Sequence, residues 1–170
     1  MAYKTFQTER LQMRPVSASF DKAFIFELLN TPKWLKNIGD RNIKSEEDAA
    51  AYINTKITPQ LEKLGYGNYV VIRKEDGAKL GTCGLYNRKG IEGVDIGFAF
   101  LPQYEKKGYA FESAKKLLTV AFDYFKITQI SGVTIIENKA SQNLLKKLGL
   151  EFKKIIKLPN DKVELLLFKN

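Results

Sequence analysis

The chain contains no histidine and a single cysteine. Without histidine, neither a Ser-His nor a Cys-His nucleophile pair can form, and no metal site can use imidazole ligands. We therefore expect no metal, and a general base must be a carboxylate, a tyrosine, a lysine, the substrate or a water chain. One cysteine also excludes an intramolecular disulfide. Cys83 lies in an apolar, strand-like stretch, so we predict a small buried core residue and not a reactive thiol.

Long hydrophobic runs are also absent. No apolar segment approaches the roughly 20 residues that a membrane-spanning helix needs, and residues 1–10 lack the apolar centre of a signal peptide. We therefore expect no membrane partner and a cytoplasmic location. Hydrophobic residues make up 44% and charged residues 28% of the chain, a typical globular composition. No repeat or Pro/Gly-rich linker divides the sequence, so a single domain over residues 1–170 is predicted.

The net charge of +9 favours an anionic ligand or partner. The lysines are spread along the chain, and the pairs Lys146-Lys147 and Lys153-Lys154 are too short for a basic tract with interleaved aromatic residues. We therefore do not expect nucleic acid as a partner. A basic RNA- or ribosome-binding protein stays open as a third hypothesis, which a steep salt dependence of nucleic-acid binding would support.

Apolar periodicity and turn residues predict alternating strands and helices. Strand patterns cover residues 11–16, 68–73, 79–86, 93–101, 130–136, 152–158 and 163–168. Helical spacing with capping residues covers residues 20–29, 46–64, 110–126 and 141–148, with Thr31-Pro32 ending the first helix and Pro59 breaking or kinking the second. This order predicts an α/β or α+β fold with a central mixed sheet of about seven strands flanked by about four helices.

The segment 101–110 joins a predicted strand to a predicted helix and contains Lys106, Lys107 and Gly108. A helix start offers unpaired N–H groups and a positive dipole end, and glycine lets the backbone approach a ligand closely. This combination suits a pyrophosphate. The alternative is a plain strand-to-helix connector whose glycine has only a packing role. Neither the P-loop spacing nor the dinucleotide-binding glycine spacing is present.

A second informative segment covers residues 136–150. Asn138 follows a predicted strand and precedes a predicted helix. Its side-chain amide can cap the helix, or it can bind the amides of an extended ligand that lies between strands.

Together these segments resemble a known family. Residues 105–110 match the glycine and the alanine of the acetyl-CoA signature of the GNAT superfamily of N-acetyltransferases, and residues 107–110 with Glu112 match its Rim-type subgroup, the ribosomal-protein alanine N-acetyltransferases. The later matches are Asn138, Ser141 and Leu148-Gly149, and the earlier ones are Thr8-Glu9-Arg10-Leu11, Arg14-Pro15, Leu28-Leu29-Asn30 and the strand 94–98. The resemblance spans about residues 8–152, and the order and spacing of the motifs make it specific.

The resemblance implies a GNAT-type fold with a mostly antiparallel, twisted sheet, and direct acetyl transfer from acetyl-CoA to a primary amine in a ternary complex. It implies that the pantetheine arm pairs with the backbone of Phe98, Ala99, Phe100 and Leu101, where the sheet splays. The amides of Lys106, Lys107, Gly108, Tyr109 and Ala110 would hold the pyrophosphate, with Asn138 and Ser141 beside the arm. The acceptor could be a protein N-terminus, an amino sugar, a polyamine or another small amine, and the chain a monomer or a homodimer.

Three positions bear on the chemistry. Glu105 stands where the family has Gln or Arg, so its carboxylate is expected to point away from the phosphates. Leu145 occupies the position of the general-acid tyrosine found in many members, so that role is not carried over. Asp95 matches a position where a carboxylate occurs near the acceptor, and it is either a catalytic base or a structural strand residue. A non-catalytic acyl-CoA-binding regulatory domain of the same fold is the alternative function, and turnover of acetyl-CoA with an amine panel separates the two.

Overall fold

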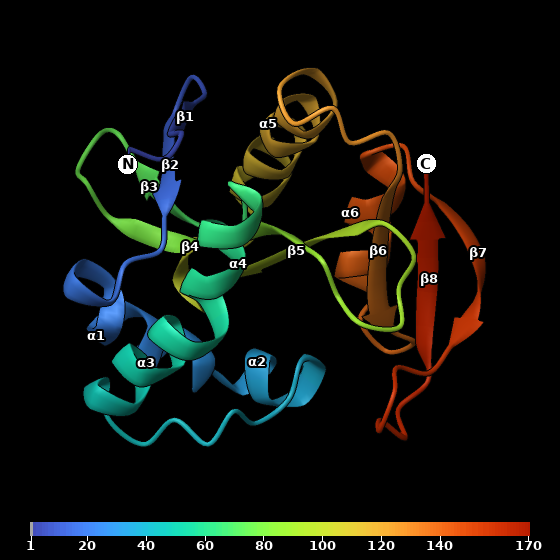
Figure 1. Cartoon of the computed structure of the whole chain (residues 1–170), viewed down its shortest axis with the longest axis horizontal. Coiled ribbons are helices and arrows are strands. Elements are labelled where there is room, and N and C mark those ends of the chain that lie inside the picture. The colour runs from blue at the N-terminus through green and yellow to red at the C-terminus, as the bar shows by residue number, and fades with distance from the viewer. Residues whose placement is uncertain (1) are drawn as a thin grey trace.

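One eight-stranded sheet runs through the computed structural model, which describes residues 2–170; Met1 lies outside the described residues (Figure 1). The strand order is β1-β2-β3-β4-β5-β6-β8-β7, and every neighbouring pair is antiparallel except β5 and β6. The predicted mixed, mostly antiparallel α/β fold is therefore confirmed. The strands are β1 (Phe6–Gln7), β2 (Leu11–Pro15), β3 (Asn68–Arg73), β4 (Lys79–Tyr86), β5 (Val94–Phe100), β6 (Ile130–Ile135), β7 (Glu151–Ile156) and β8 (Leu165–Lys169).

The additional strand is β1, whose two residues pair with β2 and are too few to show a period-two pattern in the sequence.

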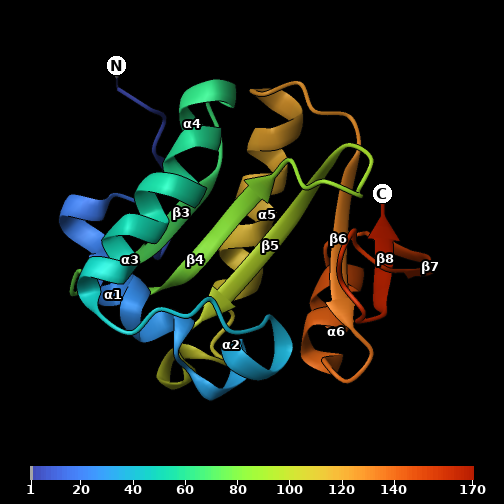
Figure 2. The same ribbon diagram turned by 60° about the horizontal axis from the view of Figure 1, so that its bottom comes forward.

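Helices cover both faces of the sheet, with α2, α3 and α4 on the near side of β4 and β5 in Figure 2 and α5 on the far side. The helices are α1 (Ala18–Leu29), α2 (Pro32–Asn37), α3 (Glu46–Tyr52), α4 (Thr58–Leu64), α5 (Tyr109–Asp123) and α6 (Lys139–Lys147).

The helix α2 was not predicted. Thr31-Pro32 does end α1, but the same two residues start α2, because the Thr31 hydroxyl accepts a hydrogen bond from the N–H of Trp34 (3.3 Å) and Pro32 occupies the first helical turn. Proline is favoured there, since its missing N–H would have no partner in the helix. The prediction treated proline only as a terminator, and it was wrong on this point.

The predicted helix at 46–64 exists with the predicted irregularity. Ser45 caps α3 by accepting the N–H of Asp48 (3.0 Å), and Gly65 ends α4 in the left-handed conformation at φ 78°. Between α3 and α4, residues Ile53–Ile57 form a π-helical turn that ends two residues before Pro59. Proline has no N–H to donate within the helix, and its ring clashes with the carbonyl four residues earlier. The helix therefore widens from an α-helical to a π-helical turn before it.

Two cores lie on opposite faces of the sheet. The larger one packs α5 against β3, β4 and β5 and includes Cys83, which is 0% exposed, and burial raises the pKa of its thiol to about 12. The prediction of a buried core cysteine is therefore confirmed. The smaller core packs α1 and α3 against Val70 and Leu101. Among the described residues 2–170, no helix is long and apolar enough to cross a membrane.

Candidate active site

The sheet opens between its two parallel strands. β5 and β6 pair only through Val94 with Ile130 and Asp95 with Ser131. The remaining residues of β5, 96–100, therefore have no partner strand on the side that faces β6. Backbone N–H and C=O groups at such an edge are available to an extended ligand. Asp95 and Ser131 therefore mark the apex of a splay that widens toward Phe100.

Two cavities meet at this splay. The first, which we call the helix-end cavity, has a volume of about 420 Å³ and lies beside the start of α5. The second, the central cavity, has about 710 Å³ and lies between the helical layer of residues 25–60 and the sheet. Their shared lining includes Trp34, Phe98, Asn138 and Ser141. A ligand that enters beside α5 can thus reach the central cavity through the splay.

The loop before α5 presents a row of free backbone donors to the helix-end cavity. Lys106 and Gly108 are in the left-handed conformation, with φ of 59° and 82°. Within the described part of the chain, the N–H groups of residues 106–111 have no hydrogen-bond acceptor. Successive N–H groups in such a turn, followed by a helix start, form a concave site for an anion.

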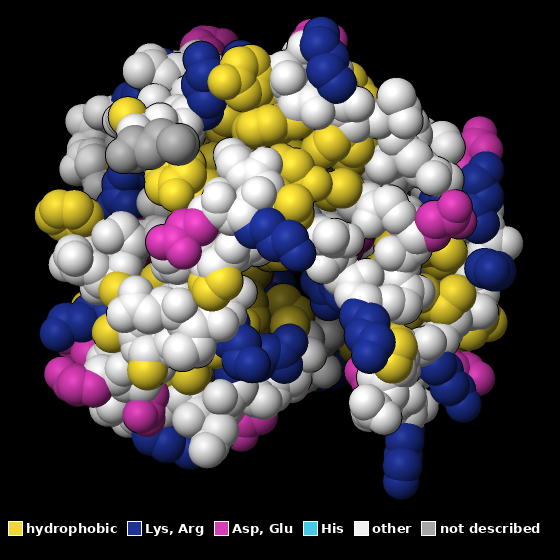
Figure 3. All heavy atoms as spheres, viewed as in Figure 1, with side chains coloured by type: hydrophobic (Ala, Val, Ile, Leu, Met, Phe, Trp, Pro, Cys, Tyr) yellow, Lys and Arg dark blue, Asp and Glu magenta, His cyan; other side chains and the backbone are white. Residues whose placement is uncertain are grey.

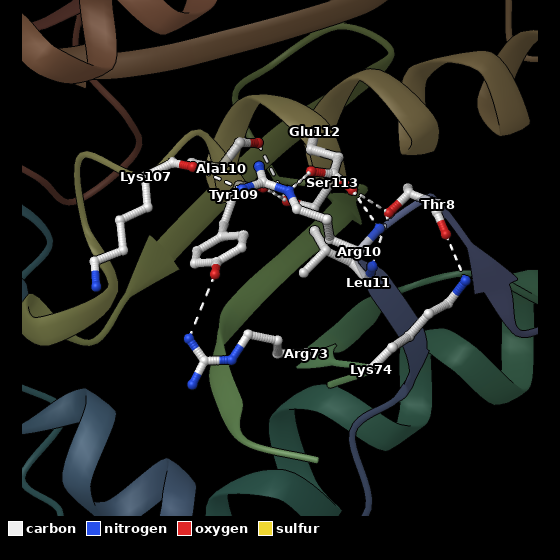
Figure 4. Close-up of polar contacts among 10 residues, drawn as sticks. All are labelled: Thr8, Arg10, Leu11, Arg73, Lys74, Lys107, Tyr109, Ala110, Glu112 and Ser113. Atoms are coloured by element: carbon white, nitrogen blue, oxygen red, sulfur yellow. Dashed lines mark hydrogen bonds and ion pairs between the residues drawn. The ribbon is translucent and has the colours of Figure 1, made fainter. Parts of the chain in front are cut away.

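A network of polar side chains holds this loop (Figure 4). Arg10 donates to Glu112 Oε2 (2.7 Å) and to the carbonyl of Lys107 (3.1 Å), and its guanidinium lies 4.5 Å from the centroid of the Tyr109 ring. Glu112 Oε1 also accepts from the Thr8 hydroxyl (2.5 Å) and from the N–H of Arg10 (3.0 Å). Burial acts to raise the pKa of Glu112, but these donors outweigh it and hold the pKa below its ordinary value. The strand β2 and the α5 loop are therefore tied together.

Glu105, at the start of the loop, forms an ion pair with Lys33 of α2. Its side chain is 23% exposed, and the residue lines the helix-end cavity. The lysine neutralises the carboxylate, so a negative charge at this position opposes an anionic ligand less than an unpaired one would.

Most of the predicted site residues lie at the helix-end cavity. They are Phe98, Ala99, Phe100, Lys106, Gly108, Tyr109, Ala110, Asn138 and Ser141. Lys107 does not line this cavity; its carbonyl accepts a hydrogen bond from Arg10, and its N–H is one of the free donors of residues 106–111. Leu101 lies apart: its N–H bonds the carbonyl of Leu80 (2.9 Å), its carbonyl accepts from Tyr104 (3.0 Å), and its side chain is buried in the smaller core. Its N–H is therefore already paired and is not available to a ligand.

Asn138 caps a helix, as one of its two predicted roles requires, and it also lines both cavities. Its Oδ1 accepts the N–H of Ser141 (3.2 Å) and so caps α6, while both residues line the two cavities at their junction. Because the Oδ1 faces the helix, the Nδ2 donor remains for the cavity.

Asp95 faces the central cavity and is 1% exposed. Its Oδ2 lies 3.3 Å from Arg88 Nη2, and its Oδ1 has no hydrogen-bond partner within residues 2–170. Burial raises the pKa of this carboxyl to about 6, against the opposing effect of Arg88. A carboxylate of that pKa can exchange a proton near neutral pH.

Sequence reasoning missed two residues next to Asp95. Tyr86 donates its hydroxyl to Asn68 Oδ1 (2.8 Å), and its ring lies against Gly97, where an added Cβ would come within 2.9 Å of Tyr86 Cε2. Burial raises the pKa of Tyr86 well above its ordinary value. Tyr86 and Arg88 reach the cavity because β4 pairs with β5 in a register that places Tyr86 opposite Asp95.

Leu145, by contrast, brings no polar atom to the central cavity. It is 1% exposed and packs on Gly132, where an added Cβ would lie 2.4 Å from Leu145 Cδ2. Among residues 2–170, no group of three or more Cys, Asp or Glu side chains is arranged to hold a metal ion.

Comparison with known proteins places this geometry in a family. Residues 10–151 match the sequence model of the acetyltransferase (GNAT) domain. The chain is 30% identical over 158 residues to the uncharacterized N-acetyltransferase YnaD of Bacillus subtilis (strain 168), covering 91% of this chain and 89% of that protein. The uncharacterized N-acetyltransferase YoaA of the same organism is 26% identical over 146 residues, which cover 85% of this chain and 81% of that protein.

Solved structures show the same fold. A GNAT-family acetyltransferase from Bacillus anthracis superimposes with a TM-score of 0.79 at 24% identity, covering 98% of both chains. The ribosomal-protein-S5-alanine acetyltransferase from Vibrio fischeri superimposes with a TM-score of 0.80 at 18% identity, covering 98% of this chain and 96% of that one. At sequence identities below 25%, these superpositions show a shared fold and nothing more specific.

Proposed function

Since the chain belongs to the GNAT acetyltransferase family and is an N-acetyltransferase, we propose that it takes the acetyl group from acetyl-CoA and transfers it directly to a primary amine. The observation that carries the proposal is the row of free N–H groups at residues 106–111, which opens onto a splayed sheet. We propose residues 1–170 as one catalytic domain.

In this proposal the pyrophosphate lies against the N–H groups of residues 106–111, with the positive end of α5 behind it. The pantetheine arm lies along β5 at Phe98–Phe100, on the side that faces β6, where these residues have no partner strand. Asn138 Nδ2 donates to the arm from the other side of the splay, and Ser141 lies beside it. The thioester then reaches the junction of the two cavities, and the amine comes from the central cavity.

Transfer requires a neutral amine, whose nitrogen bonds to the acetyl carbon while the carbon–sulfur bond breaks and the sulfur takes up a proton. Asp95 is our candidate for removing the amine proton, directly or through water, because its Oδ1 is free and its pKa is about 6. We assign no residue to the protonation of the sulfur. Positioning of the two reactants alone can supply about 7–11 kcal/mol of the barrier reduction.

The first test is coenzyme A binding. A ligand that binds only the folded state stabilises it by about 2.7 kcal/mol at a concentration of 100 times its dissociation constant. We therefore expect the melting temperature to rise with coenzyme A and with acetyl-CoA, and an unchanged melting temperature up to millimolar concentrations would contradict the proposal.

The second test is turnover. Release of the free thiol from acetyl-CoA is measured with N-terminal peptides, amino sugars, polyamines and small amines as acceptors. Binding without turnover of any class would favour the non-catalytic acyl-CoA-binding domain. The relatives named as N-acetyltransferases support the enzyme.

A further inference from the structure

The central cavity has an uneven charge. Four basic residues line it, Lys36, Arg41, Lys56 and Arg88, against two acidic ones, Asp95 and Asp161. An amine acceptor is itself a cation before it loses its proton, so a basic acceptor cavity is unexpected for a simple amine. The excess of positive charge calls for a second, negative group on the acceptor.

The hydrogen bonds and ion pairs of the lining residues make the excess of positive charge in the cavity larger. Arg88 is matched by Asp95 at 3.3 Å, and Asp161 accepts the N–H of Val163 (2.9 Å) within its own loop. Lys36, Arg41 and Lys56 have no carboxylate within 4.0 Å in the part of the chain that the structure describes. Three cations that line one cavity are therefore left without an internal counter-ion.

These three cations come from one side of the cavity. Lys36 belongs to α2, Arg41 follows it, and Lys56 lies in the π-helical turn between α3 and α4. All three therefore belong to the helical layer, whereas Asp95 belongs to the sheet. In Figure 3, Lys and Arg side chains surround a hollow in the face of the molecule viewed there.

Apolar and aromatic side chains also line the central cavity. Trp34, Ile38, Tyr52 and Ile57 line the central cavity next to the three cations in sequence. An acceptor in this cavity thus meets Asp95 and the splay on the sheet side, the unpaired cations on the helical side, and apolar or aromatic side chains as well. A volume of about 710 Å³ is typical of small-molecule sites.

Resting on the proposed function, we propose that the acceptor is a primary amine that also carries an anionic group, a carboxylate or a phosphate, a few bonds from the nitrogen. The nitrogen points to the splay beside Asn138, Ser141 and Asp95, and the anion pairs with Lys36, Arg41 and Lys56. The reverse orientation would place the nitrogen away from the thioester. Polyamines and other multiply charged cations would meet like charge and bind poorly.

The test uses acceptors that differ only in the anion. Turnover, measured as release of the coenzyme A thiol, is compared for 4-aminobutyrate and 4-aminobutanamide, for phosphoethanolamine and ethanolamine, and for putrescine. We expect the anionic member of at least one pair to have a kcat/KM about tenfold higher, mainly through KM. The two pairs distinguish a carboxylate acceptor from a phosphate acceptor. Equal use of charged and neutral members, or a preference for putrescine, would overturn the inference.

A variant identifies the residues responsible. The triple variant Lys36→Gln, Arg41→Gln, Lys56→Gln is expected to reduce the ratio of kcat/KM between the anionic and the neutral acceptor toward one. The matched control is Lys63→Gln on α4, an exposed lysine that lines neither cavity, and it should leave the ratio unchanged. A triple variant that keeps the parental ratio contradicts the assignment.

Failure of the proposed function gives a different result. If coenzyme A raises the melting temperature but no acceptor is turned over, transfer itself fails. The anion inference is then judged by the further shift in melting temperature that each acceptor causes with coenzyme A bound. A larger shift for the anionic member of a pair supports it, and equal shifts overturn it.

Discussion

Arg10 and Glu112 lie 102 positions apart in the sequence, and their side chains meet with 2.7 Å between Nε and Oε2. The same arginine donates to the Lys107 carbonyl at 3.1 Å (Figure 4). The pair thus connects the edge of the sheet to the loop whose N–H groups we assign to the pyrophosphate. The ion pair holds the loop in place, and the loop supplies the N–H donors.

From this pair we predict that Glu112→Gln weakens coenzyme A binding several-fold, because Arg10 then loses its ionic partner and orients the loop less firmly. Titration of parent and variant with coenzyme A gives the dissociation constants. The matched control is Glu9→Gln, an exposed neighbour of Arg10. The positioning role is contradicted if Glu112→Gln binds as tightly as the parent.

The motif Thr8-Glu9-Arg10-Leu11 and Glu112 were recognised separately in the sequence, but their contact was not predicted. Pairing of β2 with β3 and packing of α5 on the sheet bring them together, and neither is a local property. By contrast, the strand and helix positions followed from local periodicity and turns, so the layout could be predicted. The strand β1 was missed because it has only two residues, and α2 was missed because Pro32 was treated only as a helix terminator.

The lining of the central cavity could not be predicted for a related reason. Lys36, Arg41 and Lys56 belong to one helical layer, and Arg88 belongs to the loop after β4. They share a cavity only once that layer has packed on the sheet. No spacing rule connects them in the sequence, where each is one of 28 basic residues.

We predict that Gly108→Val weakens coenzyme A binding at least about tenfold while the protein still folds. Gly108 has φ 82°, and an added Cβ would lie 3.3 Å from Arg10 Nη2, beside the free N–H groups. A β-branched side chain both strains this conformation, by about 1–2 kcal/mol, and crowds the proposed pyrophosphate position.

Gly77→Val is the matched control for Gly108→Val. Gly77 has a similar φ of 74° and nothing within 4 Å of an added Cβ, and it lies in the turn between β3 and β4. Both variants should melt at lower temperature, but only Gly108→Val should raise the dissociation constant. Equal affinities would show that the pyrophosphate position has been misplaced.

A buried ion pair outside the site allows a prediction on stability alone. Asp21, 0% exposed, accepts from Arg14 through both oxygens (2.8 Å each), from Lys79 (2.8 Å) and from the N–H of Ser17 (2.8 Å). Asp21→Asn should therefore reduce the free energy of unfolding by about 3–5 kcal/mol. Denaturant unfolding measures it, with the exposed Asp123→Asn as the control.

The pH dependence of this effect has a definite sign. Burial acts to raise the pKa of Asp21, but its donors outweigh burial, and the net pKa is lower than the ordinary 3.8. The contribution of Asp21 is therefore present above pH 4 and is lost as the pH falls through the folded-state pKa. The deficit of Asp21→Asn should shrink below pH 4, and a deficit that is constant down to pH 2 would contradict the ionic explanation.

For Asp95 the pH dependence of stability has the opposite sign. Its pKa rises from 3.8 to about 6 on folding because it is buried, so the folded state holds a proton that the unfolded state has released between those values. Stability should therefore fall as the pH rises from about 4 to 6, by about 2–3 kcal/mol in total. Asp95→Asn removes this dependence and should lose less stability than the parent across that interval. An unchanged slope in the variant would assign the titration to another group.

The same variant tests catalysis. If Asp95 takes the amine proton, kcat/KM of the parent rises with pH through about 6, and Asp95→Asn lowers the rate about 10²-fold or more with coenzyme A affinity unchanged. The isosteric amide keeps the shape but cannot accept the proton. If Asp95 is structural, the rate and the melting temperature fall together or neither changes. The pH dependence of stability shows independently whether the Asp95 carboxyl titrates. If Asp95→Asn loses that pH dependence but keeps the full rate of acetyl transfer, Asp95 is excluded as the base. The amine proton would then pass to water or be lost before binding.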